Sequence, residues 1–289
     1  MSLSENDLKL LVGYASQAAR LAGEVIASSR PESVEHKETG HSRASQVVTE
    51  VDRRAEELIL QTLAPSIERF DLAVLSEESP DDKRRLHKAY FWCIDPLDGT
   101  LPFIEDKPGY AISIALVSRS GDALLGVVLD PREDNLYVAT KGHGLRRNDK
   151  PWTPSSSGKT LSVFVDRSLA QHSSFPDLLV AVEASAQEMG LSGAKHFVGA
   201  GAVMNACQVL THGPACYLKP PKAAEGGGSL WDFAATSCLF QEAGAIVTDI
   251  HGDKLELNRQ GSTFMNHRGV LYATSETIAS RIRHLCAPI

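Results

Sequence analysis

Two aspartates stand three residues apart in the segment F91-W-C-I-D-P-L-D-G-T100, directly after an apolar run. Proline and glycine keep the turn around Asp95 and Asp98 from being helical. At about 4 Å and an effective dielectric of about 20, two like charges repel by roughly 4 kcal/mol, so such a pair either takes up a proton or binds cations. Gly99 and Thr100 are expected to begin a helix whose free N–H groups point toward the same place. Bound cations would turn these acids into a phosphate site.

Two further acidic segments could join this pair. The string S76-E-E-S79 follows a short predicted strand and places Glu77 and Glu78 at another strand end, where solvent-exposed charges are the alternative explanation. Asp232 stands at the start of a predicted helix, where the alternative is an N-cap worth about 1 kcal/mol. A bare D-x-x-D-G string is also common in ordinary turns. The combination of the three segments, more than any one of them, favours a metal site.

Hydrophobic periodicity predicts the elements that would carry these residues. Apolar residues at three- and four-residue steps predict a helix over the first thirty residues, and a second from Thr49 to just before Pro65. Short apolar runs separated by Gly, Pro and Asp predict strands at 73–75, 90–94, 110–117, 124–129 and 136–140. After a Pro- and Ser-rich segment, the pattern predicts a strand at 161–165, helices at 175–189, 201–211 and 231–243, and a hairpin of 245–248 with 254–257.

The length of 289 residues favours two subdomains. We expect 1–150 to form an N-terminal α+β subdomain with most of the metal ligands. We expect 151–289 to form a C-terminal α/β subdomain that carries Asp232 and the wall of the substrate pocket.

Composition narrows the classes of function. With 43% hydrophobic residues, 22% charged residues and a formal net charge of −7, the chain is typical of a soluble globular protein and a poor match for a nucleic acid polymer. No apolar run reaches the roughly 18 residues of a membrane span, and the first residues lack the order of a secretion signal, so we expect no membrane partner and a cytoplasmic protein. The five cysteines lack metal-binding spacing and have mostly apolar neighbours, which indicates core positions.

In this order, the strings S76-E-E-S79, D95-P-L-D-G-T100 and W231-D-F-A-A235 resemble the inositol monophosphatase family of magnesium-dependent, lithium-sensitive sugar and nucleotide phosphatases. The pairing of the six-residue string with a later W-D-x-A-A is highly specific, and the resemblance covers nearly the whole chain. It implies an α/β fold, the layered αβαβα sandwich of two subdomains found in sugar phosphatases. It also implies a magnesium-dependent phosphoric monoester hydrolase.

The resemblance assigns metal ligands. One ion would take Glu77, Asp95 and the Leu97 carbonyl. A second would take Asp95, Asp98 and Asp232. These hard oxygen ligands suit Mg²⁺, with Mn²⁺ as an alternative, and two or three ions per site are expected.

The mechanism that the resemblance implies is attack of a metal-activated water on phosphorus, without a covalent intermediate. Thr100 and Glu77 would accept the proton, and Asp52, in the family's V-T-x-x-D string, would orient the Thr100 hydroxyl. The N–H groups of Gly99 and Thr100 would hold phosphate oxygens. Lys37 stands near a third, weaker metal position of the family, and it is equally explained as a solvated loop residue.

The substrate stays open between two classes. Gly199 and Ala200 precede the helix expected to back the pocket, and Glu225 stands seven residues before the aspartate of W-D, where the family has a pocket acid. A hydrogen-bond acceptor there favours inositol or a related polyol monophosphate. Lys219 and Lys222 instead favour the family's bisphosphate nucleotidases, because cations would hold a second phosphate.

A relative that binds a metal or a partner without catalysis is a more distant alternative. The loss of a ligand would be its signature, and no predicted ligand is missing. The expected partner is a small phosphorylated metabolite, and a homodimer is an assembly common among relatives.

Overall fold

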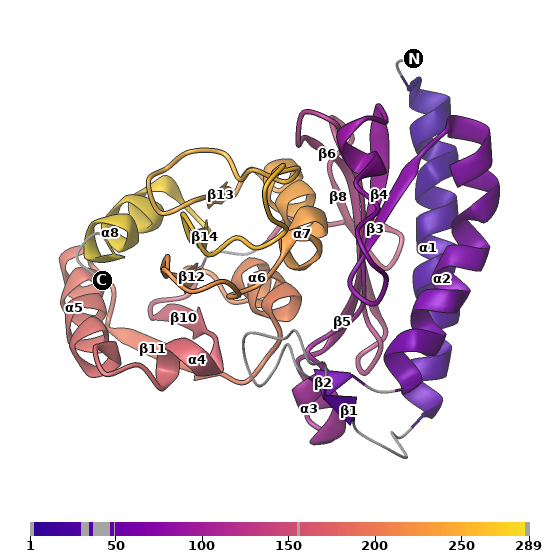
Figure 1. Ribbon diagram of the computed structural model, residues 1–289. Helices are drawn as coiled ribbons and strands as arrows, with labels where there is room; N and C mark the ends of the chain where they lie inside the picture. The colour runs from indigo at the N-terminus through magenta and orange to yellow at the C-terminus, as the bar shows by residue number, and fades with distance from the viewer. Residues whose placement is uncertain (1–2, 30–34, 37–46, 49, 155–156, 287–289) are drawn as a thin grey trace.

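The computed structural model describes residues 3–29, 35–36, 47–48, 50–154 and 157–286. Within them, helices and two sheets alternate in five layers (Figure 1). Helices α1 and α2 cover a seven-stranded sheet, α6 and α7 separate it from a five-stranded sheet, and α5 and α8 cover the outer face of the second sheet. Three hydrophobic clusters fill the spaces between the layers. The predicted αβαβα fold class is therefore confirmed.

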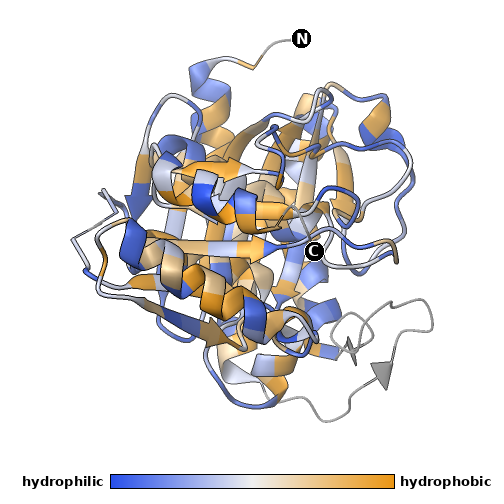
Figure 2. Cartoon of the chain, turned by 90° about the vertical axis from the view of Figure 1, so that its left-hand side faces the viewer, coloured by the Kyte–Doolittle hydropathy of each residue, from blue (hydrophilic) through white to orange (hydrophobic). Residues whose placement is uncertain are grey.

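The outer layer on the first sheet consists of α1 (Glu5–Ser28) and α2 (Glu50–Phe70). A capping box at Ser4 fixes the start of α1, since the Asp7 carboxylate accepts the Ser4 backbone N–H at 2.9 Å. In Figure 2, which is viewed from the left-hand side of Figure 1, the helices nearest the viewer carry hydrophobic and hydrophilic residues side by side, as expected for helices that cover a sheet with one face. The predicted start of the second helix at Thr49 lies outside the described residues.

The prediction that the second helix ends before Pro65 is wrong, because α2 continues through it to Phe70. An internal proline costs a helix about 3 kcal/mol. The buried face nevertheless continues across it, from Leu63 before the proline to Ser66 after it, and Ser66 Oγ accepts a hydrogen bond from Trp92 Nε1 at 3.0 Å. Packing against the sheet outweighs the local preference.

The seven-stranded sheet has the order β3-β4-β5-β6-β7-β8-β9, with β3 parallel to β4 and the remaining neighbours antiparallel. Its strands are β3 (Ala73–Ser76), β4 (Tyr90–Asp98), β5 (Ala111–Ser118), β6 (Ala123–Asp130), β7 (Asn135–Thr140), β8 (Leu145–Arg147) and β9 (Lys150–Pro151). The short helices η1 (Arg84–Leu86) and α3 (Thr100–Ile104) connect its strands. A separate two-stranded pair joins β1 (Glu35–His36) to β2 (Val47–Val48).

The five-stranded sheet has the order β11-β10-β12-β14-β13. Its strands are β10 (Leu161–Val165), β11 (Ala194–Val198), β12 (Ala215–Lys219), β13 (Ile246–Thr248) and β14 (Val270–Ala273). Its helices are α4 (Arg167–Ala170), α5 (Phe175–Glu188), α6 (Ala202–Thr211), α7 (Leu230–Glu242) and α8 (Glu276–Cys286).

The predicted hairpin of 245–248 with 254–257 is wrong, because β13 pairs antiparallel with β14 instead. The Asp249 carboxylate accepts the N–H groups of His251 and Asp253 and pairs with Arg268, which closes a local turn. This turn leaves 254–257 outside any strand. Strand β14 thus takes the place of the expected partner 254–257.

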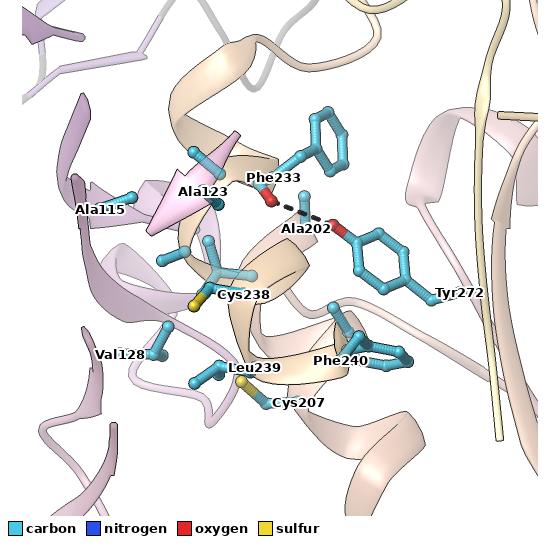
Figure 3. Close-up of a cluster of buried hydrophobic side chains, with 14 of the residues drawn as sticks. Ala115, Ala123, Val128, Ala202, Cys207, Phe233, Cys238, Leu239, Phe240 and Tyr272 are labelled. Atoms are coloured by element: carbon cyan, nitrogen blue, oxygen red, sulfur yellow. Dashed lines mark hydrogen bonds between the residues drawn. The ribbon is translucent and has the colours of Figure 1, made fainter. Parts of the chain in front are cut away.

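The central layer of α6 and α7 is packed closely against both sheets. Gly126 of β6 lies against the Ala235 carbonyl of α7, and a Cβ at this glycine would overlap that backbone. On the other side of α7, the buried Tyr272 hydroxyl donates to the Phe233 carbonyl at 3.2 Å (Figure 3). All five cysteines are buried and free, as their sequence context indicated.

The two sheets occupy successive parts of the chain, with β9 ending at Pro151 and β10 beginning at Leu161. The division into subdomains 1–150 and 151–289 stays a prediction. Among the described residues, no helix combines the length and the apolar character that crossing a membrane requires.

Candidate active site

The acidic string sits on a bulge at the end of β4. Asp95 lies opposite Ser113 of β5 and Asp98 lies opposite Ala111, so β4 has one residue more than its partner over this interval. In a regular strand, residues three apart point to opposite faces. The extra residue corrects this alternation, and it also accommodates Pro96, which cannot donate to the ladder. The bulge therefore brings both carboxylates to one side.

Three carboxylates meet beside this bulge. Each of Asp95, Asp98 and Asp232 has an oxygen within 4.8 Å of the other two. Burial and then the charges of neighbouring acids, Glu77 foremost, raise the pKa of Asp95. Burial and then the Asp232 charge raise the pKa of Asp98, and burial also raises the pKa of Asp232 against the attraction of Lys219. The cluster holds more buried negative charge than its surroundings neutralise.

Asp95 has one carboxylate oxygen without a donor. Its Oδ1 accepts the Leu97 N–H at 3.1 Å, whereas Oδ2 is buried and has no hydrogen-bond partner among the described residues. An unsatisfied buried oxygen in a native structure needs an explanation, such as an ion. Because the donors gathered here are all hard oxygens, the residues fit a divalent cation such as Mg²⁺ or Mn²⁺.

The other two acids also hold helix N-termini. Asp98 accepts the N–H groups of Ala202 and Val203 at 3.1 and 2.8 Å, at the start of α6. Gly201 precedes them, and a Cβ there would overlap the Asp98 carboxylate. Asp232 is the third residue of α7 and not its N-cap, which is Ser229, and Asp232 Oδ2 accepts the Ser229 N–H at 2.5 Å. Elements from distant parts of the chain therefore converge on the cluster.

Thr100 connects the bulge to α2. Its hydroxyl lies 3.1 Å from Asp52 Oδ1 and 3.3 Å from the Leu97 carbonyl, and Asp52 is buried. Gly99 has a φ of 85°, and the Gly109 carbonyl occupies the space that its Cβ would need. Only glycine fits there, which explains the G-T ending of the string.

A cavity of about 600 Å³ opens in front of the carboxylates. Most of the predicted site residues line it: Glu77, Asp95, Leu97, Asp98, Gly99, Thr100, Gly199, Ala200 and Asp232. Asp52 does not line the cavity and lies behind Thr100. Glu225 is exposed and is not among the lining residues, and its role stays a prediction, as do the catalytic and ligand roles of the others. Lys37 lies outside the described residues.

Asp166 also lines this cavity, although it was not among the residues predicted from the sequence. Its Oδ2 pairs with Lys219 Nζ at 2.6 Å, and its Oδ1 accepts the Tyr217 hydroxyl at 2.9 Å and Asn205 Nδ2 at 3.2 Å. Burial lowers the pKa of Lys219, but the charges of Asp166 and Asp232 outweigh burial and raise the pKa overall. The signal in the sequence was only a single acid after a predicted strand, V165-D166, which is common at strand ends.

Two curated relatives align with nearly the whole chain. The Nus factor SuhB of Vibrio cholerae serotype O1 is 28% identical over 281 residues, which cover 95% of each chain. The inositol-1-monophosphatase of Mesorhizobium japonicum is 26% identical over 279 residues, which cover 94% of this chain and 98% of the relative.

Solved structures show the same fold. Inositol monophosphatase-II from Staphylococcus aureus superposes with a TM-score of 0.71 at 21% identity, over 96% of both chains. Two structures of SaIMPase-II hold inositol monophosphate and 2′-AMP, with TM-scores of 0.67 and 0.70 at 20% and 21% identity; they cover 95% and 96% of this chain and 93% and 95% of theirs. A model of the inositol monophosphatase family matches residues 7–287, and the chain therefore belongs to the inositol monophosphatase family.

Proposed function

We propose that this protein is a metal-dependent phosphomonoesterase that hydrolyses a small phosphorylated metabolite with water as the nucleophile. The observation that carries the proposal is the buried Asp95 Oδ2, which has no donor among the residues that the structure describes and belongs to a cluster of three carboxylates that line a cavity. Membership of a family named for a phosphatase activity supports the same reading.

The proposed ligands of two or three Mg²⁺ or Mn²⁺ ions are Glu77, the Leu97 carbonyl, Asp95, Asp98 and Asp232. Bound cations would supply Lewis-acid polarisation of the phosphate, a lowered pKa for water and charge neutralisation. Without them the carboxylates would repel an anionic ester.

The remaining proposed roles belong to the protein's own groups. Glu77 would accept the proton of the attacking water, or Thr100 would accept it while passing its own hydroxyl proton to Asp52, which lies 3.1 Å away. The N–H groups of Gly99 and Thr100 would hold the phosphate oxygens as negative charge develops. The hydroxyl of the water would end on phosphorus as the P–O bond to the alcohol breaks, and the proton taken from the water would end on the alcohol oxygen. Inhibition by lithium belongs to the same proposal.

We place inositol or a related polyol monophosphate first among substrates. A relative named inositol-1-monophosphatase supports this order. SaIMPase-II, which holds inositol monophosphate in one structure and 2′-AMP in another, is compatible with both classes of substrate. The test is phosphate release with Mg²⁺, comparing kcat/KM for inositol 1-phosphate and adenosine 3′,5′-bisphosphate. No release from any ester in a panel of small phosphate monoesters, from a folded protein that binds Mg²⁺, would contradict the phosphatase proposal and favour a non-catalytic relative.

A bisphosphate nucleotidase is the second candidate, and a specific observation favours it. Lys219 and Lys222 both line the cavity, whereas Glu225, the acid expected to read sugar hydroxyls, does not. The variant Lys222→Met should selectively lower kcat/KM for the bisphosphate if that is the substrate. Lys195→Met, a change at an exposed lysine of β11, is the matched control.

A further inference from the structure

A buried glutamate in α2 lies near the candidate site without belonging to its predicted residues. Glu56 is 8% exposed, although glutamate is almost never so buried unless paired. Its Oε2 accepts the Ser79 hydroxyl at 2.9 Å, and its Oε1 has no hydrogen-bond partner among the described residues. A buried carboxylate with one neutral hydrogen bond costs the fold free energy. Stability therefore does not explain why glutamate stands here.

The Ser79 contact fixes one end of an acidic segment. Ser79 closes the string S76-E-E-S79, and at its other end the Glu77 N–H donates to the Ile94 carbonyl at 3.2 Å. Ile94 directly precedes Asp95 in β4. The segment is thus attached to β4 through the Glu77 N–H and to α2 through the Ser79 side chain, and Glu77 lines the cavity.

The same helix also holds the second acidic segment. Asp52, four residues before Glu56 and so on the same face of α2, accepts the Thr100 hydroxyl at 3.1 Å. One face of α2 therefore contacts two of the three segments that carry the predicted metal ligands, through Asp52 and through Glu56.

We infer that Glu56 is a positioning residue, which holds Ser79 and thereby fixes the place of Glu77 relative to the aspartates of the bulge. The inference rests on the proposed function in taking Glu77 as a metal ligand. Partners that orient a ligand typically change metal affinity about 10- to 100-fold when they are removed.

Calorimetric titration with Mn²⁺ tests the inference, alongside kcat and KM for phosphate release. Glu56→Leu removes the acceptor at nearly constant volume, whereas Glu56→Gln keeps a carbonyl that Ser79 can donate to. We expect Glu56→Leu and Ser79→Ala to weaken Mn²⁺ binding about 10-fold and to lower kcat more than they raise KM. Glu56→Gln should bind Mn²⁺ close to wild-type affinity, and the double variant should be no weaker than the single ones.

Glu57→Leu is the matched control, because Glu57 is the exposed neighbour in the same helix. It should bind Mn²⁺ like the wild type. Wild-type Mn²⁺ affinity in a folded Glu56→Leu or Ser79→Ala variant would overturn the inference, as would a Glu56→Gln variant as weak as Glu56→Leu. If Glu56→Leu does not fold, Ser79→Ala decides. Absence of phosphatase activity in the wild type would refute the proposed function, while the Mn²⁺ titration would still test Glu56.

Discussion

Two groups of acidic side chains line one cavity, and they differ in how their buried negative charge is compensated. Beside the bulge, Asp95, Asp98 and Asp232 crowd together, and one Asp95 oxygen has no donor within the described part of the chain. In the second group, Asp166 pairs with Lys219, and each carboxylate oxygen of Asp166 has a donor. A fold gains nothing from crowding like charges, whereas removing one member of a buried pair is costly. We propose that the first group of acids holds a cation, and that the second forms a buried ion pair that stabilises the fold.

Replacing Asp95 by Asn should produce the largest effect and separates activity from stability. Turnover should fall at least about 100-fold, the scale of losing one group that stabilises charge in a transition state. The free energy of unfolding with a chelator present should be unchanged or higher, because a repelling charge is gone. Phosphate release and urea denaturation measure the two quantities.

Asp98→Asn is the informative comparison for that variant. Asp98 also accepts two N–H groups of α6, so Asn should cost stability as well as activity. Equal unfolding free energies for the two variants would contradict the distinction between the acids.

The variant Lys219→Met tests the ion pair between Lys219 and Asp166. It leaves Asp166 without its charged partner in a place where the Asp166 side chain is only 16% exposed. We expect the free energy of unfolding to fall by about 3 kcal/mol, as measured by urea denaturation. Lys195→Met, at an exposed position, should change the free energy of unfolding little. An unchanged free energy of unfolding for Lys219→Met would show that the Asp166–Lys219 pair does not stabilise the fold.

Gly201→Ala tests how closely α6 must approach Asp98. The added Cβ would overlap the Asp98 carboxylate, so α6 or the bulge must shift. We expect a loss of about 1–3 kcal/mol in the free energy of unfolding, together with reduced turnover. Gly13→Ala in α1 is the control, because a Cβ there meets nothing within 4 Å, and it should be neutral or stabilising.

The smallest expected effect concerns an exposed pair at the cavity mouth. Hydrogen bonds from Arg167, at 2.7 Å to each Glu105 oxygen, lower the pKa of Glu105 from 4.5 to about 2. A lowered folded-state pKa adds stability above the unfolded-state value, and this stability is lost as pH falls through the folded value. The stability difference between wild type and Glu105→Gln should therefore be present above pH 4.5 and disappear by about pH 2 in acid denaturation curves. A difference independent of pH would contradict the pairing.

The sequence predicted most elements because the local period of apolar residues changes from helical to strand-like spacing. It erred where a distant partner decided the outcome. Packing of Ser66 against Trp92 carries α2 past Pro65, and the pairing of β13 with β14 replaces the local hairpin. Neither partner is visible in a short window of sequence.

For the site, the residue types alone determined that acids, a proline and a glycine would crowd one turn and attract a cation, because charge repulsion and backbone limits are local properties. Only the tertiary structure placed the Asp98 carboxylate against α6, more than a hundred residues away, paired Lys219 with Asp166, and left Glu225 off the cavity. These facts depend on which buried side chains share a space. The sequence determined the chemistry of the groups, and the packing of five layers decided which of them meet.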